Sequence, residues 1–526
     1  MVIPPSYAAT LLAAFENGGC ITALVFLLHM LLRLTKDARE PPPVDIEVPF
    51  VSVLARIGWR GLSYWDKHAY VRSHLPMFTI RLPYFRIYVV NSTKLIPIVQ
   101  RHVDTISFSP IMVEMSARFM AVSNKTSEII RRDPMDDHGF VAGMSQTTHV
   151  DLSPGQSLDS LNEESVRTLL DALERSASAV VNMREWIDKE ITMATTEAIY
   201  GPLNPFRDPA VISAWPDYEN GLAPLLLNVL PAITARRPAK AREALVRAYQ
   251  RYYAQGGHLQ ASPFIQHRYE FYFQCGVPLE DVARIEVGAA VGLISNTKPA
   301  TFWFLYHICS DELLLNACRQ ELISNAVHTH EHTRALDMTR VKGSCPVLFS
   351  AFKETFRCHG VGIAIRQVVE DDVVDNTYLL KRGSYLLIPA QVQHRQRSIW
   401  GENVDEFDHT RFLPDESNRG HKRRRNPVAF RGFGGGATLC PGRHFAATEV
   451  LAFVALEILR FDIRPRSGRW VKPSAANIRP DTMFHRLDHD PTVTLIPRGG
   501  QHRVEGNVLG FRRADEGIRR GWQYCS

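Results

Sequence analysis

Apolar residues recur every three to four positions through several long stretches of the chain, which is the spacing of one face of an α-helix. A further pattern of this kind follows Gly442 and runs to about Ile458. The chain is therefore expected to be mainly α-helical. The longest stretches predict helices at Ser160–Leu173, Trp186–Tyr200, Ala239–Tyr253 and Leu279–Cys309.

Alternating and β-branched residues are confined to short segments. Met77–Leu82 and Phe85–Val90 flank a short turn and predict a hairpin, while Tyr385–Ile388 and Val493–Ile496 predict strands late in the chain. Residues from about 108 to 149 mix polar residues with proline and glycine and match neither pattern. We expect a large helical domain that carries small β-sheets.

A charge-free apolar run, Gly18–Leu32, lies near the start of the chain. No Lys or Arg precedes it, whereas Arg33, Lys36 and Arg39 follow, and this distribution favours a membrane-anchor helix with the remaining chain in the cytosol. The run is shorter than the roughly 20 residues of a spanning helix. A cleaved signal peptide and an interfacial helix therefore stay open as alternatives.

At 526 residues the chain exceeds an ordinary single core, although large helical enzymes can remain one unit. We expect a membrane anchor and hinge at residues 1–40, a catalytic domain at 41–500 and a charged tail at 501–526. The net charge of +6 is small and its basic residues are dispersed, so nothing supports nucleic-acid binding. The eight cysteines show no paired spacing, as expected for reduced thiols in the cytosol.

One of these cysteines, Cys440, follows a glycine-rich stretch that begins at Phe433. Gly442 then opens the last helical pattern, which places the thiol at a helix N-terminus, where backbone N–H groups and the helix dipole lower the pKa of a thiol. The glycines leave room for a flat, large group against the backbone. A haem whose iron is bound by the sulfur suits this arrangement, and a glycine-rich loop with a structural cysteine is the alternative.

The spacing of Phe433, Gly436, Cys440 and Gly442 resembles the haem loop of the cytochrome P-450 superfamily. The resemblance implies the cytochrome P-450 fold and haem b, iron protoporphyrin IX, as the cofactor. It makes Cys440 the iron ligand through a thiolate that favours O–O cleavage. It also implies that Phe433 shields the sulfur and that Gly436 and Gly442 allow the loop to form.

Glu354 and Arg357 lie three residues apart on one predicted helix face and can pair laterally, as solvated helix pairs also do. Downstream, a segment ending in Arg411 resembles the Phe-x-Pro-x-Arg-Phe segment of the same superfamily, with His409 in place of the proline. The resemblance implies a buried network of Glu354, Arg357 and Arg411. Such a network is tolerated only if every charge is paired.

The helix predicted at 279–309 contains Pro299, which lacks an N–H donor and clashes with the preceding turn. The helix must therefore bend or open just ahead of Pro299, unless it is only a kinked core helix. Most monooxygenases of the superfamily place an acid and then a threonine here as a proton relay. Ser295 and Asn296 take these positions, so no carboxylate is expected in the relay, and Ser295, Asn296 and Thr297 are the catalytic candidates.

The run from Asn296 to Trp303 resembles the branch that contains prostacyclin synthase and the sterol 7α-hydroxylases. This branch includes a peroxide isomerase as well as hydroxylases, so the resemblance leaves the reaction open. The version of the loop from Cys440 to Ala446 suggests a fungal enzyme of secondary metabolism.

Thr438 stands where many members of the superfamily have an Arg or His that pairs with a haem propionate. Another cation must then serve, and Arg366 is the candidate because its segment resembles the strand that crosses beside a propionate. An exposed strand residue is the alternative reading of Arg366.

The resemblance implies a monooxygenase that takes electrons from NADPH through a separate NADPH-cytochrome P-450 reductase, for which the basic segment His421–Arg425 is a candidate docking site or merely a solvated loop. Apolar Val291, Leu293 and Ile294 favour a hydrophobic small molecule of terpenoid, sterol or polyketide type. The expected location is the endoplasmic reticulum membrane, in contact with membrane lipid. A reductase-independent isomerase or dehydratase of a peroxide and a non-catalytic haem-binding sensor are the alternatives.

Overall fold

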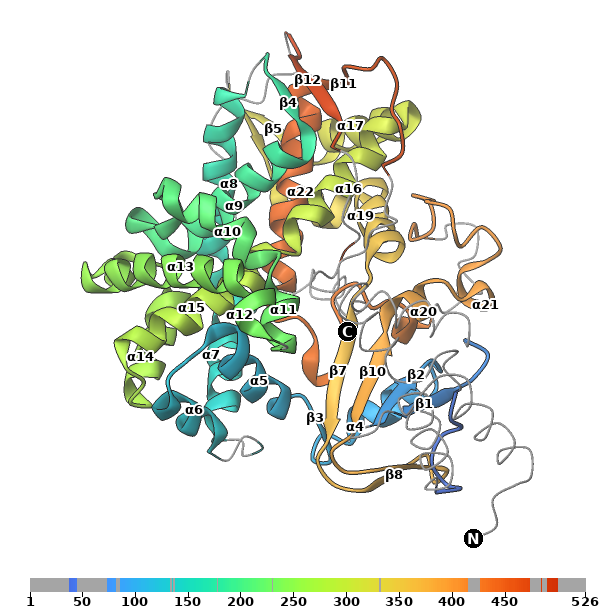
Figure 1. The fold of residues 1–526 in the computed structure, drawn as a ribbon. Helices are drawn as coiled ribbons and strands as arrows, with labels where there is room; N and C mark the ends of the chain where they lie inside the picture. Colours follow the sequence, from blue (N-terminus) through green and yellow to red (C-terminus); the bar gives the residue numbers. More distant parts are fainter. Residues whose placement is uncertain are drawn as a thin grey trace, which may run out of the picture.

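Helix α22, Arg443–Arg460, lies in the middle of the helical part of the molecule (Figure 1). It is buried on all sides, as expected of a mainly apolar helix with neighbours all round. Helices α8 and α9 lie on one side of it, and α16, α17 and α19 lie on the other. The computed structural model describes residues 37–499, except 45–72, 82–85, 133–134, 136–137, 177, 229, 331–332, 415–425, 474–483 and 485–489.

The longer helices are α7 (Phe140–Leu152), α8 (Gln156–Arg175), α9 (Met183–Tyr200), α10 (Pro209–Glu219), α13 (Arg236–Ala254), α14 (Pro263–Gln274), α15 (Leu279–Ile294), α16 (Thr297–Ser310), α17 (Glu312–Asn325) and α19 (Pro346–His359). The shorter helices are α4 (Leu95–Arg101), α5 (Ser109–Met115), α6 (Asn124–Arg131), α11 (Leu222–Leu227), α12 (Pro231–Thr234), α18 (Met338–Ser344), α20 (Ala390–His394) and α21 (Arg397–Trp400).

The strands form small sheets at the edges of the helical body (Figure 1). The largest sheet has the order β1-β2-β10-β7-β3, in which only β2 and β10 run parallel. Its strands are β1 (Met77–Arg81), β2 (Arg86–Val90), β3 (Ile106–Ser107), β7 (Ile363–Val368) and β10 (Tyr385–Pro389). The smaller sheets contain β4 (Val180–Asn182), β5 (Val327–His330), β6 (Thr333–Leu336), β8 (Asp372–Val374), β9 (Tyr378–Leu380), β11 (Phe461–Pro465) and β12 (Thr492–Pro497).

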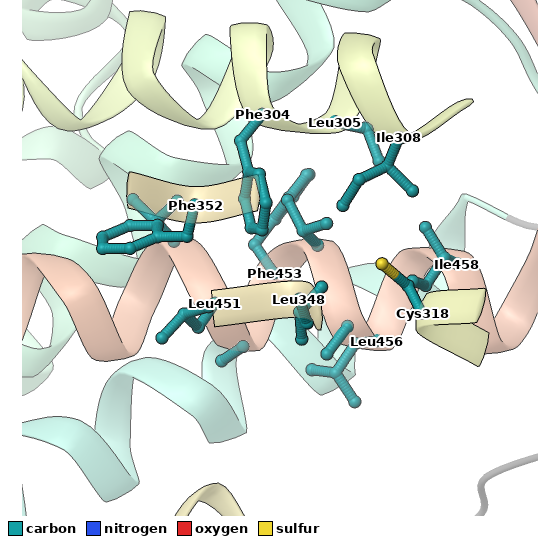
Figure 2. Packing of buried hydrophobic residues seen from close by; sticks show 14 of the residues in the cluster. Phe304, Leu305, Ile308, Cys318, Leu348, Phe352, Leu451, Phe453, Leu456 and Ile458 are labelled. Atoms are coloured by element: carbon teal, nitrogen blue, oxygen red, sulfur yellow. The ribbon is translucent and has the colours of Figure 1, made fainter. Parts of the chain in front are cut away.

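The larger core is made where α16, α17, α19 and α22 meet. Figure 2 shows Phe304 and Ile308 of α16 facing Phe352 of α19 and Leu451 and Ile458 of α22. These side chains are at most 2% exposed. Their burial fixes α19 and α22 against each other, and both helices carry residues of the candidate site.

The fold agrees with the prediction of a mainly helical chain with small sheets. The helices expected at 160–173, 186–200 and 239–253 lie within α8, α9 and α13, and the predicted hairpin is formed by β1 and β2. The unassigned region 108–149 holds α5, α6 and most of α7.

Three predicted features fall on residues that the structure leaves undescribed: the apolar run at 18–32, the basic segment at 421–425 and the tail at 501–526. Within the described part of the chain, no helix combines the length and the apolar character needed to cross a membrane.

Candidate active site

The loop before α22 curls tightly around the backbone of Cys440. Its N–H donates a hydrogen bond to the carbonyl of Phe433 over 2.9 Å. Gly434 and Gly436 have φ angles of +81° and +62°, a conformation that favours glycine. A Cβ on Gly436 would also lie 2.7 Å from Cδ of Gln100. The positive φ therefore favours glycine at 436, and any other residue there would also displace the Gln100 side chain.

Gly442 is different. Its φ is −80°, and the nearest atom to an added Cβ is 3.9 Å away, on Leu152. The protein's own atoms therefore do not require a glycine at 442.

The Cys440 thiol is largely buried, and burial raises its pKa. The N–H of Gly442 and the guanidinium of Arg443 act in the opposite direction but do not outweigh the loss of hydration. The lowered pKa expected from the helix N-terminus is therefore wrong for the protein atoms alone.

Phe433 connects this loop to α19. Its ring lies 4.7 Å from the ring of Phe356, measured between centroids, and it packs against the larger core. The predicted position of the thiol is thereby tied to the helix that carries Glu354 and Arg357.

The structure brings Glu354, Arg357 and Arg411 into direct contact. Arg357 Nε and Nη2 each donate to the Glu354 carboxylate over 2.7 Å, and Arg411 Nε donates to Glu354 Oε1 over 3.0 Å. The three side chains are between 0 and 6% exposed. Both arginines thus pair with the one carboxylate, so no charged group of this buried network lacks a partner of opposite sign.

The same two arginines also bind backbone carbonyls of the segment between α20 and residue 411. Arg357 Nη1 donates to the carbonyls of His394 and Val404, and Arg411 Nη1 donates to the carbonyl of Trp400. The network therefore holds this irregular segment against α19.

Arg366 of β7 reaches the glycine-rich loop. Its Nη2 donates to the hydroxyl of Thr438 over 2.5 Å, and its Nη1 donates to the carbonyl of Ile365. The residue is only 6% exposed, and burial lowers its pKa to about 10. Arg366 is thus a buried residue beside the loop, and the reading as an exposed strand residue is wrong.

The helix predicted at 279–309 is interrupted where Pro299 required an opening. Helix α15 ends at Ile294 and α16 begins at Thr297, so Ser295 and Asn296 form the break. Around Gly292, one turn earlier, an added Cβ would meet no atom within 4 Å. The open space therefore lies beside the last turn of α15, directly before the break.

A carboxylate does lie at this break, contrary to the sequence prediction. The Ser295 hydroxyl is 2.5 Å from Oε1 of Glu219, the last residue of α10. Lys298 Nζ lies 2.9 and 3.1 Å from the two oxygens of the same carboxylate. All three residues are at most 7% exposed, so they form a buried charge pair with a hydroxyl attached.

The neighbouring residues have structural roles. The Thr297 hydroxyl donates to the carbonyl of Leu293 over 3.5 Å, and the Trp303 ring stacks on His359 with centroids 3.8 Å apart. Trp303 therefore packs in the core, and this packing accompanies the break.

Comparisons with known proteins decide the family. Residues 292–485 match the sequence profile named Cytochrome P450. The chain is 36% identical over 454 residues to the cytochrome P450 monooxygenase nodJ of Hypoxylon pulicicidum, which covers 84% of this chain and 87% of the relative. The chain belongs to the cytochrome P450 family.

Other relatives of this P450 are more distant. A cytochrome P450 monooxygenase of Gibberella zeae is 25% identical over 466 residues, which cover 86% of this chain and 87% of the relative. Cytochrome P450 7B1 of Mus musculus is 22% identical over 472 residues, or 84% and 88% of the two chains. The predicted family and enzyme class, a P450 monooxygenase, are confirmed.

The residues of this P450 fit the haem that the family implies. Cys440 offers a sulfur ligand from a loop whose glycines leave the backbone bare, and Gly292 borders open space in a helix segment next to the break. Arg366 is a buried cation with only neutral oxygens as hydrogen-bond partners in the described part of the chain. It would suit a carboxylate of the cofactor.

Sequence reasoning missed Glu219 and Lys298 in this P450. A lysine within an apolar helix signals a buried anion nearby, because an unpaired buried charge is costly. Nothing local identifies that anion, since Glu219 lies 79 residues before Lys298 and belongs to another helix.

Proposed function

We propose that this P450 inserts an oxygen atom from O₂ into a hydrophobic small molecule of terpenoid, sterol or polyketide type during secondary metabolism. The observation that carries the proposal is the Cys440 loop, in a chain whose full-length relatives include fungal P450 monooxygenases. Haem bound through Cys440 would supply the activation of O₂ with two electrons and two protons.

The proton would be handled by residues at the break between α15 and α16. A carboxylate oxygen and a hydroxyl 2.5 Å apart can share a proton in either direction. Glu219 and Ser295 would therefore take the role of the acid that is missing from α15, and Lys298 would hold the Glu219 carboxylate in place. Asn296 and Thr297 would line the opening on the same side.

An apolar substrate is supported by the surroundings of α15. Val291 and Leu293 are only partly buried. Both pack against a second cluster of buried apolar residues, to which α10, α13, α14 and α15 contribute. A small cavity between α5, α6, α7 and α15 is lined almost entirely by apolar side chains, which are Met112, Met120, Ile130, Phe140, Val141, Met144 and Ile285, with Ser116 as the polar exception. Methionines adapt their shape to irregular apolar ligands.

Electrons would come from NADPH through a separate reductase, and the protein would be held at the endoplasmic reticulum membrane. The membrane part of the proposal is supported by exposed apolar residues between α10 and α13. Leu227, Leu230 and Ile233 are 41, 68 and 77% exposed. Side chains of this kind can enter the boundary of a lipid bilayer and would add to an anchor at residues 1–40.

Metabolite comparison tests the proposal. The full chain and Cys440→Ala are expressed with a P450 reductase in a host that makes candidate terpenoids, sterols or polyketides. We expect an oxygenated product, labelled by ¹⁸O₂, only with the unmodified chain, and a carbon monoxide difference band at about 450 nm only in that sample.

The same experiment separates the alternatives. A product that forms without reductase and without ¹⁸O would favour a peroxide isomerase or dehydratase, and haem binding without any product would favour a sensor. The missing acid and threonine are the reason to consider the isomerase, and the Glu219 carboxylate that accepts from Ser295 supports the monooxygenase instead.

A further inference from the structure

Two buried arginines lie near each other beside the haem loop, and only one of them was anticipated. Arg366 belongs to β7, and Arg431 precedes Phe433 by two residues. Each is 6% exposed. Among the described residues neither forms an ion pair with a carboxylate, and the Nη2 atom of Arg431 is buried without any hydrogen-bond partner.

Such an arrangement is unfavourable in the protein alone. Burial lowers the pKa of each arginine to about 10, and repulsion from Arg366 contributes to the lowering at Arg431. Other buried arginines of the chain are compensated, as Arg268 is by Glu286 at 2.7 Å. Two uncompensated buried cations indicate that an anion completes the site.

A third donor points to the same place. The Nε2 atom of Gln100, on α4, is buried and has no partner. A Cβ added to Gly435 would lie 3.2 Å from Arg431 Nη1 and 3.4 Å from Gln100 Nε2. The two side chains thus approach the same point beside Gly435, five residues before Cys440.

Charge and position together identify the anion. Two guanidinium groups match two carboxylates, each of which a guanidinium can bind through two parallel hydrogen bonds. Arg366 already contacts Thr438, two residues from the cysteine. A large flat cofactor bound at Cys440 could therefore have its carboxylate groups near Arg366.

We propose that Arg366, Arg431 and Gln100 together bind the two propionate groups of haem, with Arg431 supplying the cation that Thr438 cannot. This inference rests on one part of the proposed function, which is that the protein binds haem; it does not depend on the substrate or the reaction. Arg431 acts as a cofactor-binding residue, and its backbone N–H, which donates to Nε2 of His394 over 2.9 Å, fixes its place.

Haem retention tests this assignment. The full chain and its variants are purified with haem, and transfer of haem to excess apomyoglobin is followed by absorbance. We expect Arg431→Met to transfer haem about tenfold faster than the unmodified chain, because a charge-assisted pair is lost. Arg431→Lys should be intermediate, and Gln100→Leu should transfer about threefold faster, as expected for loss of a neutral donor.

Arg464→Met, at an exposed position of β11, is the charge control and should transfer haem at the rate of the unmodified chain. The reduction potential of the haem gives a second reading, which should fall in Arg431→Met, because removing a cation disfavours the added electron. Circular dichroism and the 450 nm band establish that each variant is folded with its thiolate bound. Should Arg431→Met not fold, Arg431→Lys and Gln100→Leu decide the matter.

Transfer from Arg431→Met, or from both milder variants, within twofold of the unmodified rate would overturn the assignment and leave the proposed function intact. Absence of haem from the unmodified, folded chain would instead refute the proposed function.

Discussion

The hydroxyl of Ser295 lies 2.5 Å from the carboxylate of Glu219, although the two residues are 76 positions apart in the chain. Ser295 occupies the break between α15 and α16, and Glu219 ends α10. The carboxylate that the sequence lacks at position 295 is thus brought there by another helix. Lys298 binds the same carboxylate and completes a buried neutral unit.

Substitution of Glu219 should reduce turnover without removing the haem. Glu219→Gln retains a hydrogen-bonding side chain but cannot exchange a proton, so we expect product formation to fall at least about tenfold and peroxide release per NADPH to rise. The measurement is product and hydrogen peroxide at equal 450 nm absorbance, with Glu219→Asp as the conservative variant.

A purely structural role of Glu219 predicts a different result. Glu219→Gln leaves the Lys298 ammonium buried and unpaired, and Lys298→Met in the same chain removes that charge. If the double variant regained normal turnover, Glu219 would serve packing only. Glu286→Gln, which breaks a buried pair with Arg268 at the middle of α15, is the matched control and should not raise peroxide release.

Loss of Glu354 should destabilise the fold strongly. Glu354→Gln removes the carboxylate that both buried guanidinium groups share and leaves them mainly with neutral acceptors, so we expect a loss of about 3–5 kcal/mol in the free energy of unfolding. Chemical denaturation followed by circular dichroism measures this loss.

The comparison for Glu354 is a pair at the surface. Glu402 binds Arg397 over 2.9 Å, and the two side chains are 86 and 55% exposed. Glu402→Gln should therefore cost only about 0–1 kcal/mol. Equal losses in the two variants would contradict the structural importance of the Glu354 network.

Glu449 of α22 makes stability depend on pH. Burial raises its pKa to about 7, although the hydroxyls of Ser165 and Thr195 donate to its carboxylate and act in the opposite direction. The native state therefore keeps a proton that the unfolded chain releases near pH 4.5. The stabilisation is complete below that pH and is lost as the pH rises to about 7.

Glu449→Gln removes this loss, because the amide is neutral at every pH. We expect the variant to be more stable than the unmodified chain at pH 8 by roughly 1–3 kcal/mol and to show a flatter stability profile between pH 5 and 7. Thermal unfolding across this range is the measurement, and parallel profiles for the two proteins would refute the prediction.

Two glycines of α15 should respond in opposite ways to alanine. At Gly292 an added Cβ meets nothing within 4 Å, so Gly292→Ala should raise stability by about 0.5–1 kcal/mol through helix propensity. At Gly288 the Cβ would lie 2.6 Å from Met120, so Gly288→Ala should destabilise.

Measurement of turnover shows whether substrate or oxygen occupies the open space beside Gly292. If substrate or oxygen occupies the region at Gly292, Gly292→Ala should slow product formation while the protein becomes more stable. Unchanged product yield and pattern in Gly292→Ala would show that this space is not part of the site.

Local spacing was sufficient for the features that lie within one element. The loop around Cys440, the pairing of Glu354 with Arg357 on one helix face, and the opening ahead of Pro299 all follow from neighbours in sequence. Arg411 was found because its own segment resembles that of a known family.

Contacts between distant elements could not be found in this way. Glu219 and Gln100 sit in ordinary helical patterns, and only the packing of α10 on the break and of α4 on the loop gives them a partner. The pKa of Cys440 was misjudged for a related reason, because the pattern indicates a helix N-terminus but not how far burial removes water from the thiol.

The charge pair at the break has a mechanical consequence. The Glu219 carboxylate connects the end of α10 to Ser295, in the break between α15 and α16, and to Lys298, at the start of α16. Any displacement of α10 large enough to admit a bulky molecule must either pull the interrupted segment with it or release Ser295 and Lys298. If Glu219 and Ser295 deliver protons as proposed, displacement of α10 would therefore also separate or shift the two groups that share the proton.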